Sequence, residues 1–401
     1  MKRVVVTGIM IFSFLLIGTL IGIFYAKGYR IVPNNGSPMV EGTGLLVLTS
    51  KPDAAKVFVN NQIATATNNT INLTPGDYEI KIVKDGYFAW NKKITIKKEV
   101  VSRADALLFP TAPKLESTTS TGAQNPVLDS TETLIAYTVS SASAQKNGIY
   151  VLDMNSKPIL NIGGASTQIA DNSFVDFSNA LLEFSPDGTQ LLATVSLGIN
   201  PATYLLSTKG FSDRFQDVTE TILQIKNTWE KQKAEKIKKL IDDQNNKLTD
   251  LINENFQNPT FSLEQDTVLY EASRSANIPI LITPRVIGTD STPEERNIQK
   301  GNLYVYDIKE DRNYLIFDRS QLRKDENMPR FTWYPDSRHL VFVKDRKINV
   351  TEYDGGNVTT VYAGPFVDDF VFPWNDGNSL VILTNLNIDE APINLYRLIL
   401  K

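Results

Sequence analysis

One turn pattern, repeated along the chain, constrains the fold more than any other feature of the sequence. In residues 181–196, LLEFSPDGTQLLATVS, the turn Ser185–Gly188 separates two apolar runs that suit β-strands. An acidic or serine turn residue followed four positions later by an apolar strand recurs at several places. These residues are Ser130, Asp187, Glu264, Asp336 and Asp376. Because another strand-like run follows most copies, the sequence predicts five β-sheet units rather than one isolated hairpin.

The spacing of the copies predicts a β-propeller. The last two copies, at Asp336 and Asp376, are 40 residues apart, close to the length of one four-stranded blade. The wider intervals contain a helical insertion at about 216–256 and a Pro- and charge-rich excursion at 277–301. We therefore predict a propeller of about five blades over residues 111–401. Six is the alternative, in case the wide second interval contains another blade.

The end of the chain predicts how the ring closes. The last unit has only three strands before Lys401, so a fourth strand must come from elsewhere. Residues 106–118, ALLFPTAPKLEST, precede the first unit and are placed to supply it. An open ring would leave strand edges with unpaired N–H and C=O groups. We therefore expect this segment to complete the last blade.

The N-terminus predicts a membrane anchor. Residues 4–26 carry no charge and lie between Lys2-Arg3 and Lys27. A helix of that length rises about 34 Å, and a bilayer core is about 30 Å thick. A signal peptide has a shorter apolar region, and no small-residue cleavage pattern is obvious after this one. We predict an uncleaved transmembrane helix within residues 1–30, with a signal peptide as the alternative. The flanking charges hardly decide its orientation.

A linker and a small β domain follow the anchor. Residues 31–43 are rich in Pro, Gly and Asn, which predicts a flexible linker. Residues 44–110 then alternate between apolar and polar side chains. Asn60-Asn61 suits a tight type I′ hairpin because Asn tolerates positive φ, and Thr74–Asp77 predicts a second turn. The sequence therefore predicts a small antiparallel β-sandwich over this range.

The motifs of this small domain resemble the PEGA domain. Pro52–Ala55 stands where that family has Pro-Glu-Gly-Ala, with Ala54 in place of the glycine. The other matching elements are Val57 and Val59, Pro75–Tyr78, and Gly86-Tyr87. A left-handed backbone at Ala54 would cost energy, since Ala carries a Cβ. The resemblance implies a non-catalytic module, of a kind often attached to the outer face of bacterial and archaeal membranes beside repeat domains.

The predicted blade turns resemble those of TolB-type and WD-repeat-like propellers, in which Phe-Ser-Pro-Asp-Gly joins the first two strands of a blade. Phe184–Gly188 matches well, and Tyr334–Ser337 and Trp374–Gly377 match in part. A turn Asp can accept a hydrogen bond from the backbone two residues on. We therefore interpret the turn acids as turn formers and not as catalytic groups. Sialidase propellers have a residue between Asp and Gly, so the adjacent Asp187-Gly188 does not fit them.

The insertion at 216–256 carries apolar residues at helical spacing, on one helix or on two that break near Asp242-Asp243. These residues are Val218, Ile222, Ile225, Trp229, Ile237, Leu240, Ile241, Leu248, Leu251 and Ile252. The first hypothesis, which we favour, is a brace that packs on the propeller. The second is a docking arm for a partner. The stretch Lys231–Lys239 is interleaved with Glu and predicts a solvated face.

Composition excludes several kinds of chemistry. The chain has no cysteine, which excludes disulfides, Cys-ligated zinc, iron–sulfur clusters and thiol nucleophiles. His339 is the only histidine, so a His-clustered metal site is excluded, and we interpret this residue as structural. A net charge of −4 gives no general attraction to nucleic acid. The carboxylates of Asp368-Asp369 would point to opposite faces of a strand, so we reject them as a glycosidase pair.

Two hypotheses of function follow, from different classes. The first is a membrane-anchored binding or scaffolding protein of the cell envelope, which uses the propeller to contact an envelope protein or glycan. It has no catalytic, cofactor-binding or metal-binding residues and no cofactor, it does not bind nucleic acid, and the bulk of its chain lies outside the cytoplasm. The alternative is an envelope hydrolase of glycan or peptide with its site in the propeller channel. The sequence contains none of the motifs GxSxG, GxxxxGK[ST], HExxH or GxGxxG, which favours the first hypothesis.

Overall fold

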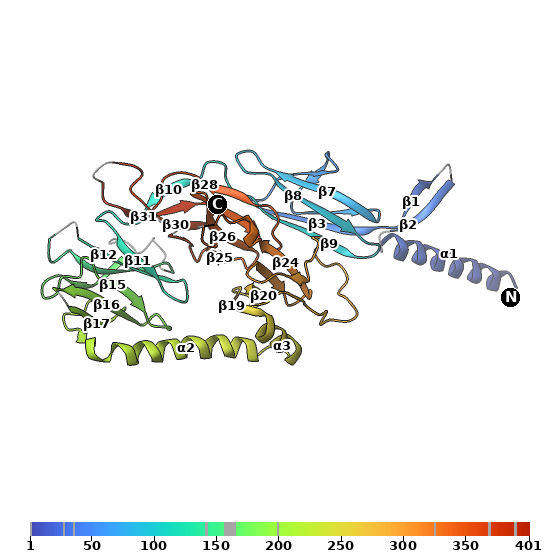
Figure 1. Ribbon diagram of the computed structural model, residues 1–401. Helices are drawn as coiled ribbons and strands as arrows, with labels where there is room; N and C mark the ends of the chain where they lie inside the picture. The colour runs from blue at the N-terminus through green and yellow to red at the C-terminus, as the bar shows by residue number, and fades with distance from the viewer. Residues whose placement is uncertain are drawn as a thin grey trace. The chain divides into compact units, whose positions relative to one another are not determined.

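The computed structural model describes residues 2–26, 29–34, 37–140, 143–155, 166–198, 200–324, 326–367, 370–388 and 391–401. Most of its elements are β-strands, with one apolar helix at the N-terminus and two helices near the middle of the chain (Figure 1). The chain divides into two compact units. The first is Met1–Thr111 with Ile282–Glu294, and the second is Ala112–Leu281 with Glu295–Lys401.

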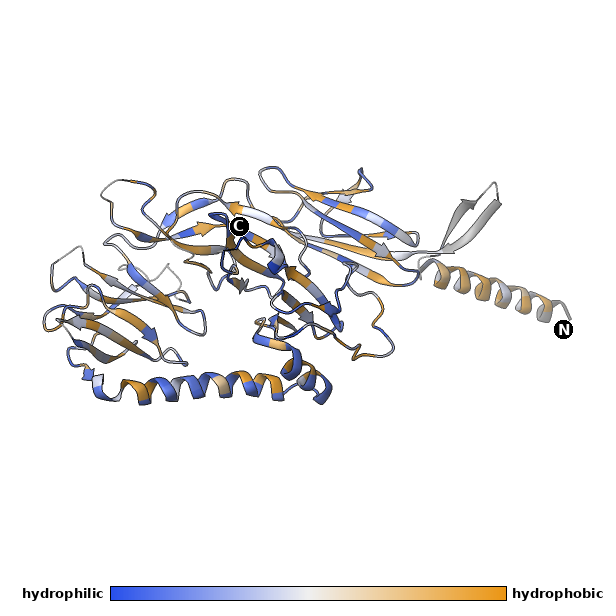
Figure 2. Ribbon diagram, viewed as in Figure 1, coloured by the Kyte–Doolittle hydropathy of each residue, from blue (hydrophilic) through white to orange (hydrophobic). Residues whose placement is uncertain are grey.

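The first unit begins with helix α1 (Lys2–Ala26), whose stretch Val6–Tyr25 is long and apolar enough to cross a membrane. Figure 2 shows hydrophobic residues along the whole of this helix. The segment after it differs from the flexible linker that we expected. Strands β1 (Tyr29–Asn34) and β2 (Ser37–Gly42) pair there as an antiparallel hairpin. The Pro- and Asn-rich composition therefore belongs to a paired ribbon and not to an irregular tether.

Two sheets form the small domain that follows. Its strands are β3 (Gly44–Lys51), β4 (Lys56–Val59), β5 (Gln62–Ala66), β6 (Asn69–Leu73), β7 (Gly76–Val83), β8 (Trp90–Ile96) and β9 (Val101–Leu107). They are ordered β6-β3-β9 and β5-β4-β7-β8, and β3 pairs with β9 in parallel. The side chains that alternation predicted to face inward on β7 and β8, such as Ile80, Ile82, Ile94 and Ile96, are buried in one apolar cluster. That part of the prediction is confirmed.

The two turns of the small domain at Asn60-Asn61 and Ala54 use left-handed backbone. Asn60 and Asn61 have φ of 48° and 64°, as the predicted tight hairpin requires. Ala54 has φ of 55°, so the turn that resembles Pro-Glu-Gly-Ala keeps a backbone that favours glycine. The Cβ of Ala54 makes this conformation about 1 kcal/mol less favourable than glycine would.

The tip of the excursion, Ile282–Glu294, belongs to the first unit. Lys92 Nζ on β8 lies 2.8 Å from Asp290 Oδ2, and both side chains are largely buried. The Thr95 N–H donates a hydrogen bond of 2.9 Å to Ser291 Oγ. Strand β8 therefore holds the tip through an ion pair and a backbone contact. The composition of the excursion indicated a departure from the blade pattern but did not predict this attachment.

The second unit contains five four-stranded antiparallel sheets. The first is β11 (Gln124–Leu128), β12 (Leu134–Val139), β13 (Gly148–Asp153) and β14 (Ser166–Asp171), and the second is β15 (Leu181–Phe184), β16 (Gln190–Leu197), β17 (Asn200–Ser207) and β18 (Gln216–Asp217). The third is β19 (Phe256–Phe261), β20 (Thr267–Ala272), β23 (Leu303–Asp307) and β24 (Arg312–Phe317). The fourth is β25 (Phe331–Trp333), β26 (His339–Lys344), β27 (Lys347–Glu352) and β28 (Thr359–Tyr362). Each predicted turn joins the first two strands of a sheet.

The fifth sheet closes on the start of the unit, in the order β10-β31-β30-β29. Its own strands are β29 (Val371–Pro373), β30 (Ser379–Thr384) and β31 (Asn394–Ile399), and the fourth is β10 (Lys114–Ser117). Strand β10 pairs antiparallel with β31 from Lys114 opposite Ile399 to Ser117 opposite Tyr396. The predicted closure is therefore confirmed for the second half of the segment 106–118. Its first half, which includes Ala106 and Leu108, is buried in the core of the small domain.

Helices fill the wide interval between the second and third sheets. A short 3-10 turn (Thr219–Thr221) leads into α2 (Ile222–Asp242), and α3 (Asn246–Asn255) follows directly. The break falls where Asp242-Asp243 predicted it. The Asn245 side chain caps α3 by accepting a hydrogen bond of 3.0 Å from the Leu248 N–H. Within this interval, which the structure describes without a gap after residue 199, there is no further sheet.

Candidate interaction sites on the propeller

The acids of the predicted blade turns are engaged in their own turns. The Asp187 carboxylate accepts a hydrogen bond of 3.1 Å from the Thr189 N–H and one of 2.6 Å from the Ser185 hydroxyl. The backbone N–H two residues on also donates to Asp336, at 2.9 Å, and to Asp376, at 2.8 Å. The hydrogen bond from Ser185, followed by that from Thr189, lowers the pKa of Asp187. These carboxylates are therefore turn formers, as expected for a Ser-Pro-Asp-Gly repeat.

His339 is buried at the start of β26, only 5% exposed. Its Nδ1 lies 2.7 Å from Asp336 Oδ2. Burial opposes the charged imidazole, but the carboxylates of Asp336, Glu352 and Asp354 raise the pKa of His339 above its usual value. His339 and Asp336 are therefore paired within one turn. This contact agrees with the structural interpretation of His339.

Clusters of possible metal ligands were sought among the described residues. There, no group of three or more His, Asp or Glu side chains could hold a metal ion. Asp368 and Asp369, which we rejected as a glycosidase pair, lie outside the described residues.

The first half of the helical insertion packs on the second sheet. Trp229 is 5% exposed and lies in one cluster with Leu192, Leu205 and Val218, while Ile222 and Ile225 pack at its edge. Lys226 Nζ on α2 also lies 2.7 Å from Glu183 Oε2 on β15. The brace hypothesis is confirmed for this part of the stripe.

The second half of the insertion packs on the third sheet. Ile241, Leu248, Leu251 and Ile252 form one cluster with Val268 and with three tyrosines of the sheet. Phe256, directly after α3, stacks on Tyr270 with ring centroids 3.5 Å apart. Ile237 differs from the prediction, because it is 41% exposed. The middle of α2, including Lys231–Lys239, is therefore a solvated span between two buried ends.

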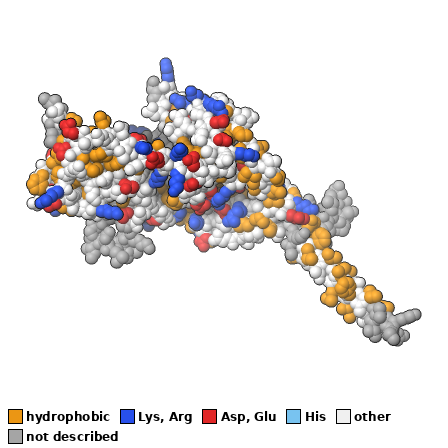
Figure 3. Space-filling view, turned by 90° about the horizontal axis from the view of Figure 1, so that it is seen from below, with side chains coloured by type: hydrophobic (Ala, Val, Ile, Leu, Met, Phe, Trp, Pro, Cys, Tyr) orange, Lys and Arg blue, Asp and Glu red, His pale blue; other side chains and the backbone are white. Residues whose placement is uncertain are grey.

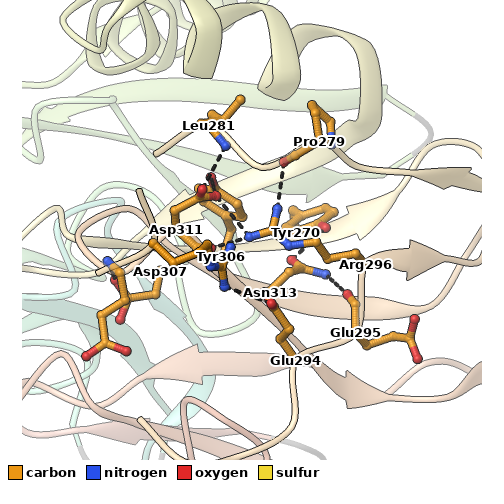
Figure 4. A network of polar contacts seen from close by, with 12 residues as sticks. Tyr270, Pro279, Leu281, Glu294, Glu295, Arg296, Tyr306, Asp307, Asp311 and Asn313 are labelled. Carbon is orange, nitrogen blue, oxygen red and sulfur yellow. Dashed lines mark hydrogen bonds and ion pairs between the residues drawn. The ribbon is translucent and has the colours of Figure 1, made fainter. Parts of the chain in front are cut away.

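A polar network fixes the stem of the excursion to the third sheet (Figure 4). Arg296 pairs with Asp311 at 3.0 Å, and these side chains are only 12% and 1% exposed. Asp311 also accepts hydrogen bonds from the Tyr306 hydroxyl at 2.6 Å and the Leu281 N–H at 2.7 Å. Asn313 accepts from Tyr270 at 2.9 Å and donates to the Glu295 carbonyl at 2.6 Å. The charges are satisfied inside the network, so its role is to hold the stem.

A depression of about 470 Å³ opens at one end of the fourth sheet. Three separate segments line it: residues 326–329 before β25, residues 343–346 around the β26–β27 turn, and Gly364 with Phe366 after β28. The lining combines the charges of Glu326, Lys344, Asp345 and Arg346 with the apolar side chains of Met328, Val343 and Phe366. Such a mixture of charged and apolar groups suits a peptide segment better than a bare ion.

The β26–β27 turn carries two of these charged residues, Asp345 and Arg346, in a backbone conformation that is energetically unfavourable for them. Asp345 and Arg346 have φ of 51° and 55°, in a two-residue turn that usually takes Asn-Gly. Left-handed backbone at Arg346 is disfavoured by about 1 kcal/mol or more. Both side chains are exposed, so packing does not explain the choice of residues. Backbone strain beside a depression points to a functional position. The sequence alone gave no signal for it, because the lining comes from three segments that are apart in the chain.

Comparison with known families finds one match, to the PEGA domain, at residues 43–111. Comparison with curated proteins finds no match. Among solved structures, a putative TolB from Agrobacterium tumefaciens is 13% identical with a TM-score of 0.22, over 72% of this chain and 77% of that one. TolB from Acinetobacter baumannii is 13% identical with a TM-score of 0.21, over 92% and 65%. The β-propeller domain of the trilobed protease from Pyrococcus furiosus is 11% identical with a TM-score of 0.21, over 89% and 96%.

These structural likenesses are too distant to carry an argument, and the propeller rests on the strand pairing of the chain itself. Five four-stranded sheets follow one another, and the last is completed by a strand from the start of the unit. The sequence motifs at Pro52–Ala55 and Pro75–Tyr78 lie inside the matched family range. Residues 43–111 match the PEGA domain, and in this chain they follow an N-terminal apolar helix and precede a β-propeller.

Proposed function

We propose that this protein is a membrane-anchored binding protein of the cell envelope, which recognises a segment of another envelope protein at the depression of its fourth propeller sheet. Helix α1 supplies the anchor, and the PEGA domain and the propeller lie outside the cytoplasm. The activity is recognition and not catalysis. The observation that carries this proposal is the depression, which combines charged and apolar side chains and includes the exposed, strained turn at Asp345 and Arg346.

The chemistry of the lining favours a protein partner over a glycan. Arginine and aromatic residues are the side chains that most often dominate the energy of protein interfaces, and Arg346 and Phe366 supply one of each. Glycan recognition at a shallow site would be expected to use broad aromatic platforms, whereas Phe366 is the one aromatic residue of this lining. Lys344 is partly committed elsewhere, because its Nζ lies 4.9 Å from the centroid of the Phe317 ring.

The state of the turn acids supports a non-catalytic role. Asp187, Asp336 and Asp376 accept hydrogen bonds from their own turns. A glycosidase, which is one form of the alternative, would need two carboxyl groups about 5–10 Å apart, with one held protonated. The hydrogen bonds and charges around Asp187 and Asp336 instead lower the pKa of both residues.

The test is capture of a partner by the full-length protein in detergent from envelope extract, compared between variants. Arg346→Glu with Phe366→Ala should reduce the captured partner roughly ten-fold or more, as expected when two anchor residues are lost. Lys209→Glu, a charge reversal at an exposed position in the connection between β17 and β18, is the matched control and should capture as wild type does. Equal capture by all three proteins would refute the site. Recovery of the partner as cleaved fragments would favour the hydrolase.

A further inference from the structure

The PEGA domain has one end at which the chain arrives from α1, called here the anchor-side end. Strand β2 ends at Gly42, and β3 begins at Gly44. The Leu45 N–H donates to the Val100 carbonyl at 3.0 Å, and the Glu99 N–H donates to the Thr43 carbonyl at 3.0 Å. These bonds place the β8–β9 turn, residues 97–100, at the anchor-side end.

Direct contacts connect this turn to the end of α1. The Tyr29 hydroxyl donates a hydrogen bond of 2.6 Å to Glu99 Oε1, and Lys98 Nζ lies 4.9 Å from the centroid of the Tyr29 ring. The Tyr29 ring also meets the Phe24 ring of α1 edge to face, with centroids 4.9 Å apart. Tyr29 is three residues beyond Ala26, a chain length of at most about 11 Å. The distance from the end of α1 to the turn is therefore no more than three residues of chain plus one tyrosine side chain.

Exposed apolar side chains gather at the same end. Gly288 of the excursion tip lies against the turn, since a Cβ built there would stand 2.8 Å from Val100 Cγ1. Beside it, Ile287 is 72% exposed, and Val101, at the start of β9, is 50% exposed. Figure 3 shows hydrophobic side chains on the part of the surface next to α1. We name Val101 and Ile287 the apolar rim.

We propose that the anchor-side end of the PEGA domain rests in the headgroup layer of the membrane that holds α1. The apolar rim faces the boundary with the acyl chains, and the exposed Lys97 and Lys98 face anionic phosphates. This inference rests on the proposed anchoring by α1. It adds a second contact with the lipid, made by the folded domain itself.

A lipid surface fits the chemistry of this end better than water or a protein does. Apolar groups flanked by lysines are the usual composition of segments that lie in a membrane interface. The headgroup layer adds roughly 5–8 Å on each side of the hydrocarbon core, and the turn lies one short chain segment beyond α1. The Glu99 carboxylate, which anionic lipid would repel, accepts the hydrogen bond from Tyr29. Tyrosine itself is enriched at membrane interfaces.

The absence of cysteine makes a site-specific test direct. Single-cysteine variants of the full-length protein carry an environment-sensitive fluorophore at one position each. They are reconstituted in vesicles of phosphatidylcholine and phosphatidylglycerol that contain a lipid-borne quencher near the headgroup. Ile287→Cys and Val101→Cys report on the rim, and Phe24→Cys reports on the anchor. Phe88→Cys, an exposed apolar position at the opposite end of β8, is the matched control.

We expect the labels at Phe24, Ile287 and Val101 to be quenched by the lipid, roughly two-fold or more above the label at Phe88. Lys97→Glu with Lys98→Glu should reduce quenching at Ile287 while leaving quenching at Phe24 unchanged. Quenching at Phe24 with none at Ile287 and Val101 would overturn the lipid contact and leave the anchor standing. No quenching at Phe24 would refute the anchor, and the inference with it.

Discussion

The propeller is held together in two different ways on the two sides of its second sheet. Toward the first sheet, the contact is direct: Phe177, Leu191 and Ala193 are fully buried in a cluster with Ile149 and Ala136. Toward the third sheet, the face that carries Leu192 and Leu205 is covered by α2. The far end of the insertion covers the third sheet in turn. An apolar sheet face therefore needs cover, but the cover does not have to be another sheet.

The two intervals also differ in polarity. The cluster between the first and second sheets is formed by apolar side chains and a few aromatic rings. The third sheet instead places Tyr270, Tyr304 and Tyr306 against the helices and carries the Arg296–Asp311 pair behind them. We expect stability to depend on polar groups and pH mainly on that side. The predictions below test this difference, from the largest expected effect to the smallest.

The largest effect should come from removing the main contact on either side. Trp229→Ala, on the helix, and Phe177→Ala, between the sheets, should each cost about 3–5 kcal/mol of unfolding free energy, as truncations of buried aromatic residues do. Leu223→Ala, at a position 73% exposed on the same helix, should stay within about 0.5 kcal/mol. Thermal melts of the three variants measure this. An unchanged midpoint for Trp229→Ala alone would show that the contact between α2 and the second sheet contributes little to stability.

The buried ion pair should give the next largest effect. Asp311→Asn keeps the shape of the side chain but leaves the charge of Arg296 without its carboxylate, at a cost of about 3 kcal/mol. Glu254→Gln is the matched control, because the Glu254–Arg274 pair at 2.8 Å is more than half exposed on both sides. That pair should contribute less than about 1 kcal/mol. Similar denaturant midpoints for both variants would contradict the claim that stability at the third sheet depends on buried polar groups.

The closing strand should matter less than either core. Leu115→Pro removes a backbone donor from β10 and disturbs its pairing with Leu398 of β31. We expect a loss of about 2 kcal/mol, on the order of one or two strand hydrogen bonds and their packing. Hydrogen exchange of β31 reports the effect locally. Faster exchange in β31 with unchanged exchange in β16 is expected. No change in β31 would show that the ring does not depend on this strand.

Asp307 should give an effect of opposite sign. Burial, followed by repulsion from Glu310 and Asp266, raises the pKa of Asp307 to about 6. The folded state therefore favours the protonated acid, a stabilisation that is complete below about pH 3.8 and is lost as pH rises through about 6. Asp307→Asn keeps an acceptor for the Glu310 N–H and should stabilise the protein by about 1–3 kcal/mol at pH 7. The gain should vanish below about pH 4, and a gain that is constant across pH would contradict this cause.

Local patterns of the sequence predicted most of the helices and strands, but not which of them pack against each sheet face. The turns at Asp187, Asp336 and Asp376 carry their own hydrogen bonds, so four or five residues suffice to recognise them. The spacing of apolar residues likewise identified α2 and α3. It could not show that the helices take the place of a sheet contact, because that depends on two faces that meet only after folding. The exposed Ile237 shows the same limit, since its spacing suits burial but no sheet reaches it.

For the same reason, local sequence patterns could not predict the lining of the depression or the attachment of the excursion. Arg346, Met328 and Phe366 come from three connections of the fourth sheet, and their convergence is a property of the fold. Asp290 joins Lys92 across 198 positions of sequence. Nothing in the neighbourhood of either residue specifies its partner. The segment 106–118 is an intermediate case. Its pairing with the last sheet was predicted correctly, but the sequence did not show that its first half is buried in the core of the small domain.

The location of the propeller tests the proposed function most directly. Because the chain has no cysteine, Lys236→Cys provides one exposed thiol on α2, and Lys2→Cys provides one at the start of α1. Both full-length variants are treated with a membrane-impermeant maleimide, in intact spheroplasts and after lysis. We expect Lys236→Cys to be labelled before lysis and Lys2→Cys only after it. Labelling of Lys236→Cys only after lysis would place the propeller in the cytoplasm and contradict an envelope-binding protein.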